Sequence, residues 1–133
     1  GSLSVYFNLD NGTGKIRGIY MQGNDAVAPI FARWIEPLRS AGVTTLATRG
    51  VGGSDQAMFD AIGIPAFQFV QDPIEYDSHT WHTNLDTYER IVERDVKQAA
   101  TTVAAAVYQL AMRDERLPRF SKEEMPKAPP SRP

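Results

Sequence analysis

Residues 52–87 constrain the fold of this chain more than any other stretch. They combine a glycine turn, a short helical segment that Ser54 or Asp55 can cap, an apolar run over residues 65–70 and a long polar loop. The apolar run is nearly continuous, which is typical of a strand buried on both faces of a sheet. The loop, residues 71–85, is long for a plain connector and carries both histidines of the chain. This stretch predicts an α/β structure with a functional loop.

The remaining elements follow from hydrophobic periodicity, with a period of two for strands and of about 3.6 for helices. The turn at Asn11-Gly12 predicts that the first two strands pair as an antiparallel hairpin. A capping box at Asp86 and Glu89 predicts a short helical segment after the loop. The expected elements are strands over residues 3–9, 15–21, 43–48 and 65–70 and helices over residues 27–41, 54–62 and 95–113. Together they predict an α/β fold, a mixed β-sheet flanked by helices.

Composition limits the domain organisation and the partners. The chain has 133 residues, enough for one domain with a core, which we place at residues 1–117. Residues 118–133 are rich in proline and are predicted to form a flexible tail. The net charge of −2, without a basic block, argues against nucleic acid as a partner. No apolar run is long enough to predict a membrane span.

Cysteine is absent, so any metal must be held by His, Asp or Glu. Asp10 follows the first predicted strand and could be a carboxylate ligand, although an Asp before Asn-Gly more simply starts a turn. His82 could be an imidazole ligand, although a lone loop histidine is more often a surface residue. The Asp86 carboxylate could orient the His82 ring by a hydrogen bond, or it could simply cap a helix. Asp10, the turn at residues 50–55 and the loop with the histidines each follow a different strand, so we expect them to meet at one end of the sheet.

Other polar and aromatic side chains could shape a pocket near these residues. Tyr76 and Trp81 could line a pocket or merely cover the loop, and the glycine turn that ends at Ser54 could hold an anion but is more simply structural. A self-contained hydrolase that uses Ser54, Asp55 and His82 is a poor interpretation, because the sequence gives no convincing arrangement of a base for the serine. Composition and spacing alone therefore predict an α/β domain with one loop that could carry a functional site.

Three motifs in a fixed order carry a family resemblance. They are FNLDNGTG at residues 7–14, SDQAMFDAIGIPAF at residues 54–67 and WHTNLDTYERI at residues 81–91. With the alanine-rich helix that follows, they resemble the C-terminal half of the clan MH zinc exopeptidases. These include dizinc aminopeptidases, glutamate carboxypeptidases and the carboxypeptidase Q-like branch. The resemblance implies the corresponding part of a zinc-exopeptidase (phosphorylase/hydrolase-like) fold over roughly residues 3–117.

The resemblance also implies the chemistry. Members of the family bind two zinc ions, and Asp10 and His82 match a ligand of each. The other ligands and the glutamate that acts as general base lie before the Asp10 motif in the family and have no counterpart here. We therefore expect a part of a metallo-exopeptidase that cleaves terminal peptide bonds, inactive by itself. It need not bind zinc in isolation. The alternative is a non-enzymatic binding module derived from a peptidase fold.

The resemblance implies further properties of the chain. The partner of the intact enzyme would be a peptide substrate, and a secreted or periplasmic location is expected. Two positions depart from the pattern, since family members often have histidine in place of Gln56 and Trp81. The strand that ends at Asp10 is central in the family, so here it should present an open edge through which the chain self-associates. The resemblance also implies that the turn at residues 52–55 and the loop at residues 72–81 shape the substrate pocket, with Ser54, Asp55, Tyr76 and Trp81 as its candidate residues. Arg49 is a weaker candidate for contacting a substrate carboxylate.

Overall fold

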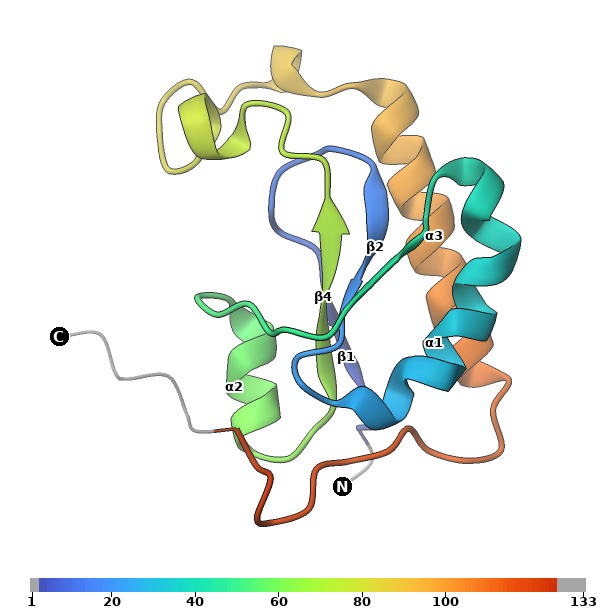
Figure 1. Cartoon of the computed structure of the whole chain (residues 1–133). Helices are drawn as coiled ribbons and strands as arrows, with labels where there is room; N and C mark the ends of the chain where they lie inside the picture. The colour runs from blue at the N-terminus through green and yellow to red at the C-terminus, as the bar shows by residue number, and fades with distance from the viewer. Residues whose placement is uncertain (1–2, 127–133) are drawn as a thin grey trace, which may run out of the picture.

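The computed structural model describes residues 3–126. Its elements, in chain order, are β1 (Tyr6–Asn8), β2 (Ile16–Tyr20), α1 (Ala28–Ile35), β3 (Thr45–Ala47), α2 (Asp55–Ala61), β4 (Ala66–Gln71) and α3 (Glu93–Ala111). Short 3₁₀ turns lie at Asp25–Val27, Glu36–Ala41 and Tyr88–Arg90, and a π-helical turn lies at Tyr76–Thr80. The chain is thus a mixed α/β structure, as predicted (Figure 1).

Within the described residues the sheet has four strands, in the order β1-β4-β2-β3. β4 pairs in parallel with β1 and antiparallel with β2, and β2 pairs in parallel with β3. The predicted hairpin between the first two strands is therefore wrong, because β4 lies between β1 and β2. The buried apolar run of β4 favours this central position, where the strand has a neighbour on each side. In the described part of the chain β1 pairs with β4 alone, which confirms the prediction of an edge strand.

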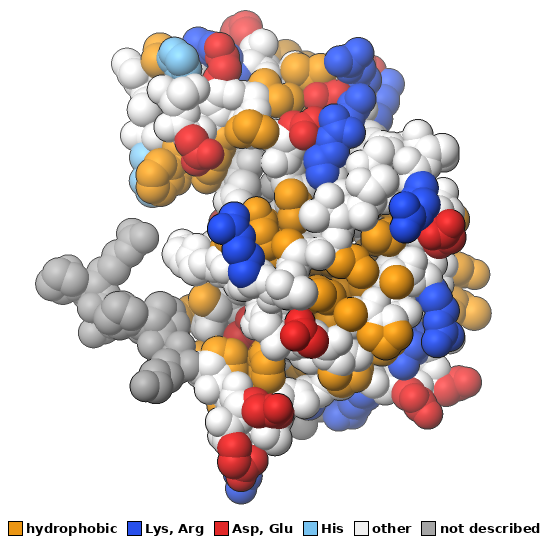
Figure 2. Space-filling view, viewed as in Figure 1, with side chains coloured by type: hydrophobic (Ala, Val, Ile, Leu, Met, Phe, Trp, Pro, Cys, Tyr) orange, Lys and Arg blue, Asp and Glu red, His pale blue; other side chains and the backbone are white. Residues whose placement is uncertain are grey.

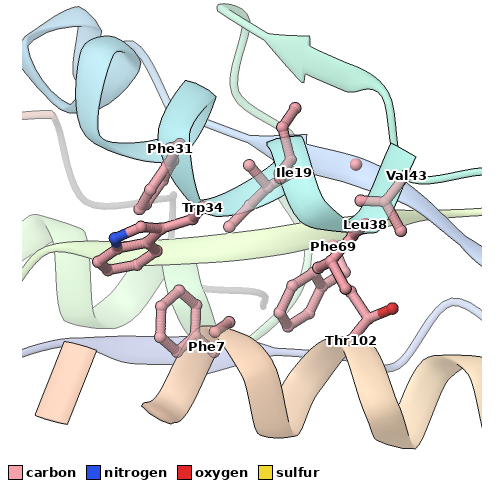
Figure 3. A pocket seen from close by; sticks show the side chains of 11 residues that line it. Phe7, Ile19, Phe31, Trp34, Leu38, Val43, Phe69 and Thr102 are labelled. Carbon is pink, nitrogen blue, oxygen red and sulfur yellow. The ribbon is translucent and has the colours of Figure 1, made fainter. Parts of the chain in front are cut away.

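Helices cover both faces of the sheet. Figure 1 shows α1 and α3 on one side and α2 on the other. Between the sheet, α1 and α3 lies the main core, whose most buried aromatic residues are Phe31 and Phe67, in an edge-to-face contact at 4.8 Å. A small cavity of about 30 Å³ remains in this core (Figure 3). On the opposite face, Tyr6 of β1 stacks on Phe59 of α2 at 4.2 Å.

The helix ends are set by glycine and proline. α1 tightens at Pro37 into the 3₁₀ turn Glu36–Ala41, because proline removes one backbone donor. Gly42 follows with a φ of 86°, a left-handed conformation that glycine adopts without strain. The predicted capping box at Asp86 and Glu89 does not form. Instead, the 3₁₀ turn Tyr88–Arg90 begins after Thr87, which makes no side-chain capping bond.

The segment after α3 crosses the sheet end away from the polar loop. Leu117 is buried at 2% exposure, and Asn24 donates a hydrogen bond to the carbonyl of Pro118. Arg119 donates to the carbonyls of Gly63 and Leu3. The first residues of the predicted tail thus contact the body of the protein, and residues 127–133 lie outside the described part. No helix among residues 3–126 combines the length and apolarity needed to cross a membrane.

Candidate metal and substrate site

A polar cavity of about 550 Å³ lies beside the end of β1. Its lining comes from three parts of the chain: the turn after β1, the turn before α2 and the loop after β4. The lining residues are Asp10, Asn11, Gly52, Gly53, Ser54, Tyr76, Asp77, Trp81, His82 and Asp86. β1 and β4 are parallel, so their carboxyl ends lie at the same end of the sheet. In open α/β sheets, ligands bind at the carboxyl ends of the strands. Figure 2 shows a hollow below the part of the molecule that carries the pale-blue histidines.

Asp10 is held by two side chains. Asn8 donates through Nδ2 to Asp10 Oδ1 at 2.9 Å, and the Ser54 hydroxyl donates to Asp10 Oδ2. Ser54 occupies the N-cap position of α2 but makes no capping hydrogen bond to that helix. An N-cap serine usually satisfies a free N–H of its own helix. Here its hydroxyl is used instead to fix the Asp10 carboxylate.

Glutamine side chains hold the two turns that line the cavity. Gln22 accepts a hydrogen bond from Val51 N at 2.8 Å and donates one to Val51 O at 2.9 Å, as a neighbouring strand would. Gln71 accepts from Asn11 N at 3.2 Å and donates to Gly12 O at 2.9 Å. Each turn therefore has a partner for its backbone groups without belonging to the sheet. The sequence pattern did not reveal these contacts, because the amide partners are distant in sequence.

His82 lies in a strained part of the polar loop. Its φ of 56° is left-handed, as are those of Ile74 at 30° and Glu75 at 58°, and such values are uncommon outside glycine. The π-helical turn Tyr76–Thr80 lies between them, and an ion pair between Arg90 and Glu75 supports its start. Strained backbone and π turns concentrate at functional sites. These features make His82 stand out among the residues of the loop.

Aromatic rings form one wall beside His82. Trp81 contacts the His82 ring with centroids 4.8 Å apart, and the Tyr76 ring with centroids 6.3 Å apart. Trp81 remains 52% exposed, which leaves its indole face available. Burial raises the pKa of Tyr76, and the nearby carboxylates of Asp10, Asp77 and Asp86 raise it further. This end of the cavity is thus aromatic and carries negative potential.

Other predicted residues lie elsewhere or lack the expected contact. Asp55 does not line the cavity; its carboxylate accepts a hydrogen bond from the Tyr6 hydroxyl at 3.3 Å. His79 lies 2.8 Å from the Ser78 hydroxyl through Nδ1 and is not part of the lining. Among the described residues no hydrogen bond joins Asp86 to His82, so a role of Asp86 in orienting His82 stays a prediction. Ser54 faces Asp10, which leaves it without a histidine base.

The donor chemistry of the cavity suits one side of a metal site. Asp10 provides a carboxylate and His82 an imidazole, both ordinary zinc ligands. Within residues 3–126, however, no three His, Asp or Glu side chains come close enough together to enclose a metal ion. A protein zinc site normally needs at least three such ligands. The described residues therefore fit two ligand positions and leave the others unfilled.

Comparisons with known proteins agree with this geometry. Residues 2–107 match the model of peptidase family M28. Aminopeptidase YwaD of Bacillus subtilis (strain 168) is 34% identical over 86 residues, which cover 63% of this chain and 19% of that protein. The crystal structure of a peptidase M28 precursor from Shewanella amazonensis SB2B superposes with a TM-score of 0.68 at 28% identity, over 88% of this chain and 27% of that one. The chain thus spans about a fifth of the length of its curated relative. It belongs to peptidase family M28.

Proposed function

We propose that this chain forms one wall of a two-zinc exopeptidase site, with Asp10 and His82 as ligands of different ions. The observation that carries the proposal is that these two residues, distant in sequence, line the same cavity at the ends of β1 and β4. Zinc, when bound, lowers the pKa of a bound water and polarises the scissile carbonyl. The residues of this chain would hold the metals and shape the pocket for the terminal residue of a peptide.

The chain by itself would be inactive. Its described residues provide two ligand positions and no cluster of three, and the family resemblance places the general base in a part without a counterpart here. The crystal structure from Shewanella is matched over 27% of its length, so most of that protein lies outside the match. The missing ligands would come from such a part of a larger peptidase domain.

The charge of the cavity favours a substrate with a free amino terminus. With Asp10 used for a metal, Asp77 and Asp86 remain to attract a cation, and no lysine or arginine of residues 3–126 lines the cavity. Arg49, the candidate for binding a substrate carboxylate, instead lies over the Tyr20 ring with its Cζ 6.0 Å from the centroid. The charge therefore supports an aminopeptidase rather than a carboxypeptidase. The exposed Trp81 ring would contact the side chain of the terminal residue.

Activity measurements test the proposed inactivity of the chain. The 133-residue chain is incubated with zinc and with aminoacyl anilide and dipeptide substrates, beside the Asp10→Ala variant as the matched control. We expect no difference between the two proteins. Turnover by the wild-type chain that Asp10→Ala abolishes would show that the chain completes an active site without further ligands.

A non-enzymatic binding module is the second candidate function. The absence of a three-ligand cluster from the described residues favours it. The two functions differ in the metal content of a longer protein that contains this segment and the rest of the peptidase domain. Zinc near two per chain supports the peptidase, and a folded protein without zinc supports the binding module.

We also infer that the chain self-associates through the free edge of β1, as the resemblance leads us to expect. β1 is only three residues long, which limits the backbone groups available for pairing with another strand. We expect a weak, concentration-dependent dimer by light scattering. A monomer at millimolar concentration would count against this surface.

A further inference from the structure

The side-chain amide of Asn8 is the donor around which the Asp10 end of the site is organised. Asn8 is the last residue of β1 and is buried at 7% exposure. Its Nδ2 lies within hydrogen-bond distance of four oxygens: Asp10 Oδ1 at 2.9 Å, Ser54 Oγ at 2.8 Å, Gln56 Oε1 at 3.1 Å and Gln68 Oε1 at 2.5 Å. A primary amide has two hydrogens. The four acceptors therefore compete for them.

Among the four acceptors that compete for the Asn8 hydrogens, Gln68 is a polar residue at a buried position, and packing does not explain it. It lies on the central strand β4, is buried at 1% exposure, and pairs in register with Asn8. Its own Nε2 is buried without a hydrogen-bond partner among the described residues. Turning the amide over would direct this nitrogen at Asn8 Nδ2, donor against donor, so the observed orientation is the better one. A buried donor without a partner destabilises the folded state, and an apolar residue on this strand would avoid that cost.

We propose that Asn8 is the positioning residue of the Asp10 carboxylate and that Gln68 weakens this contact by competing for the Asn8 hydrogens. A metal ligand is pre-organised when hydrogen bonds from the surrounding residues fix its orientation. Gln68 takes the shortest of the four contacts, so it draws Asn8 away from Asp10. Removing Asn8 and removing Gln68 should thus have opposite effects on Asp10. A role in stability alone would not produce opposite signs.

The use of Asp10 as a zinc ligand rests on the proposed function, but its positioning can be measured without metal. In isotope-labelled protein, three-bond couplings from Cγ to the backbone nitrogen and carbonyl carbon report whether Asp10 keeps one χ1 rotamer. The variants are Asn8→Leu and Gln68→Met, both similar in size to the wild-type side chains. Asp77 provides the matched control, because it lines the same cavity and, among the described residues, is not one of the four acceptors of the Asn8 amide.

We expect a single Asp10 rotamer in the wild type and rotamer averaging in Asn8→Leu, with no change at Asp77. In Gln68→Met the single rotamer should persist, and the Asn8 amide proton that bonds Asp10 should move downfield. Unchanged Asp10 couplings in Asn8→Leu would overturn the proposal and leave Ser54 as the anchor. If Asn8→Leu does not fold, an unmoved Asn8 amide resonance in Gln68→Met overturns it alone. Either result leaves the question of zinc binding to a separate measurement.

Discussion

The core beneath α1 and α3 and the cavity beside Asp10 are held together by different interactions. Large apolar side chains fill the core, where Phe31 and Phe67 are almost completely buried. Around the cavity, amide side chains hold the backbone and the carboxylate instead, with Gln22, Gln71 and Asn8 as the main donors and acceptors. Apolar contacts are numerous and non-directional, whereas each hydrogen bond depends on one geometry. The core should therefore determine global stability, and the amides should determine local order at the site.

The largest effect is expected in the core. Phe31→Ala removes a ring that is 1% exposed, and Phe→Ala substitutions at such sites cost about 3–5 kcal/mol. Urea unfolding followed by circular dichroism measures this loss. Met58→Ala is the control, because Met58 is 59% exposed and should change stability by less than about 0.5 kcal/mol. A cost below about 1 kcal/mol for Phe31→Ala would mean that the core does not dominate stability.

A pH-dependent effect is expected on the α2 side of the sheet. Burial raises the pKa of Asp60 from 3.8 to about 6, against the hydrogen bond that its carboxylate accepts from Ala66 N–H. Because the folded state keeps this proton to a higher pH, the stability contributed by Asp60 is full below pH 4 and is lost as the pH rises through 6. Relative to Asp60→Asn, the wild type should lose roughly 2–3 kcal/mol of unfolding free energy between pH 4 and pH 7. Parallel stability curves for the two proteins would contradict this.

Substituting the glutamines tests whether these amide contacts determine local order at the site rather than global stability. Gln22→Leu removes both hydrogen bonds to Val51, which should cost about 1–2 kcal/mol in total. Hydrogen exchange should increase most in residues 50–54. Gln98→Leu is the matched control, since Gln98 makes the same pair of bonds to Ile16 away from the cavity. Equal exchange of residues 50–54 in both variants would show that Gln22 has no local role.

The smallest effect is expected from the ion pair across β2 and β4. Arg17 donates to both carboxylate oxygens of Asp72 at 2.8 and 2.6 Å, and this contact lowers the pKa of Asp72. Both side chains are more than a third exposed, so solvent screens the pair. Arg17→Met should lose about 0.5–1 kcal/mol in low salt and less in 1 M salt. A loss that does not depend on salt would assign the effect to packing of the arginine stem.

The core could be predicted from the sequence, and the amide contacts could not. Helical spacing around Phe31 and the apolar run of β4 identified the buried faces, because burial follows a periodic pattern. The same periodicity does not report strand order, so the turn at Asn11-Gly12 suggested a hairpin where β4 separates the two strands. The cavity was anticipated because strand ends and motifs placed Asp10 and His82. The roles of Gln22, Gln71 and Asn8 depend on contacts between distant residues, which no local pattern records.

We propose that Asp10 and His82 each bind a zinc ion within a complete peptidase domain. The most direct test replaces the matched segment of the Bacillus aminopeptidase with this chain and measures the zinc content of the folded, purified chimaera. We expect zinc near two per molecule, reduced to about one by Asp10→Ala and likewise by His82→Ala, while His79→Ala has no effect. A folded chimaera that keeps both zinc ions in the Asp10→Ala and His82→Ala variants would contradict it.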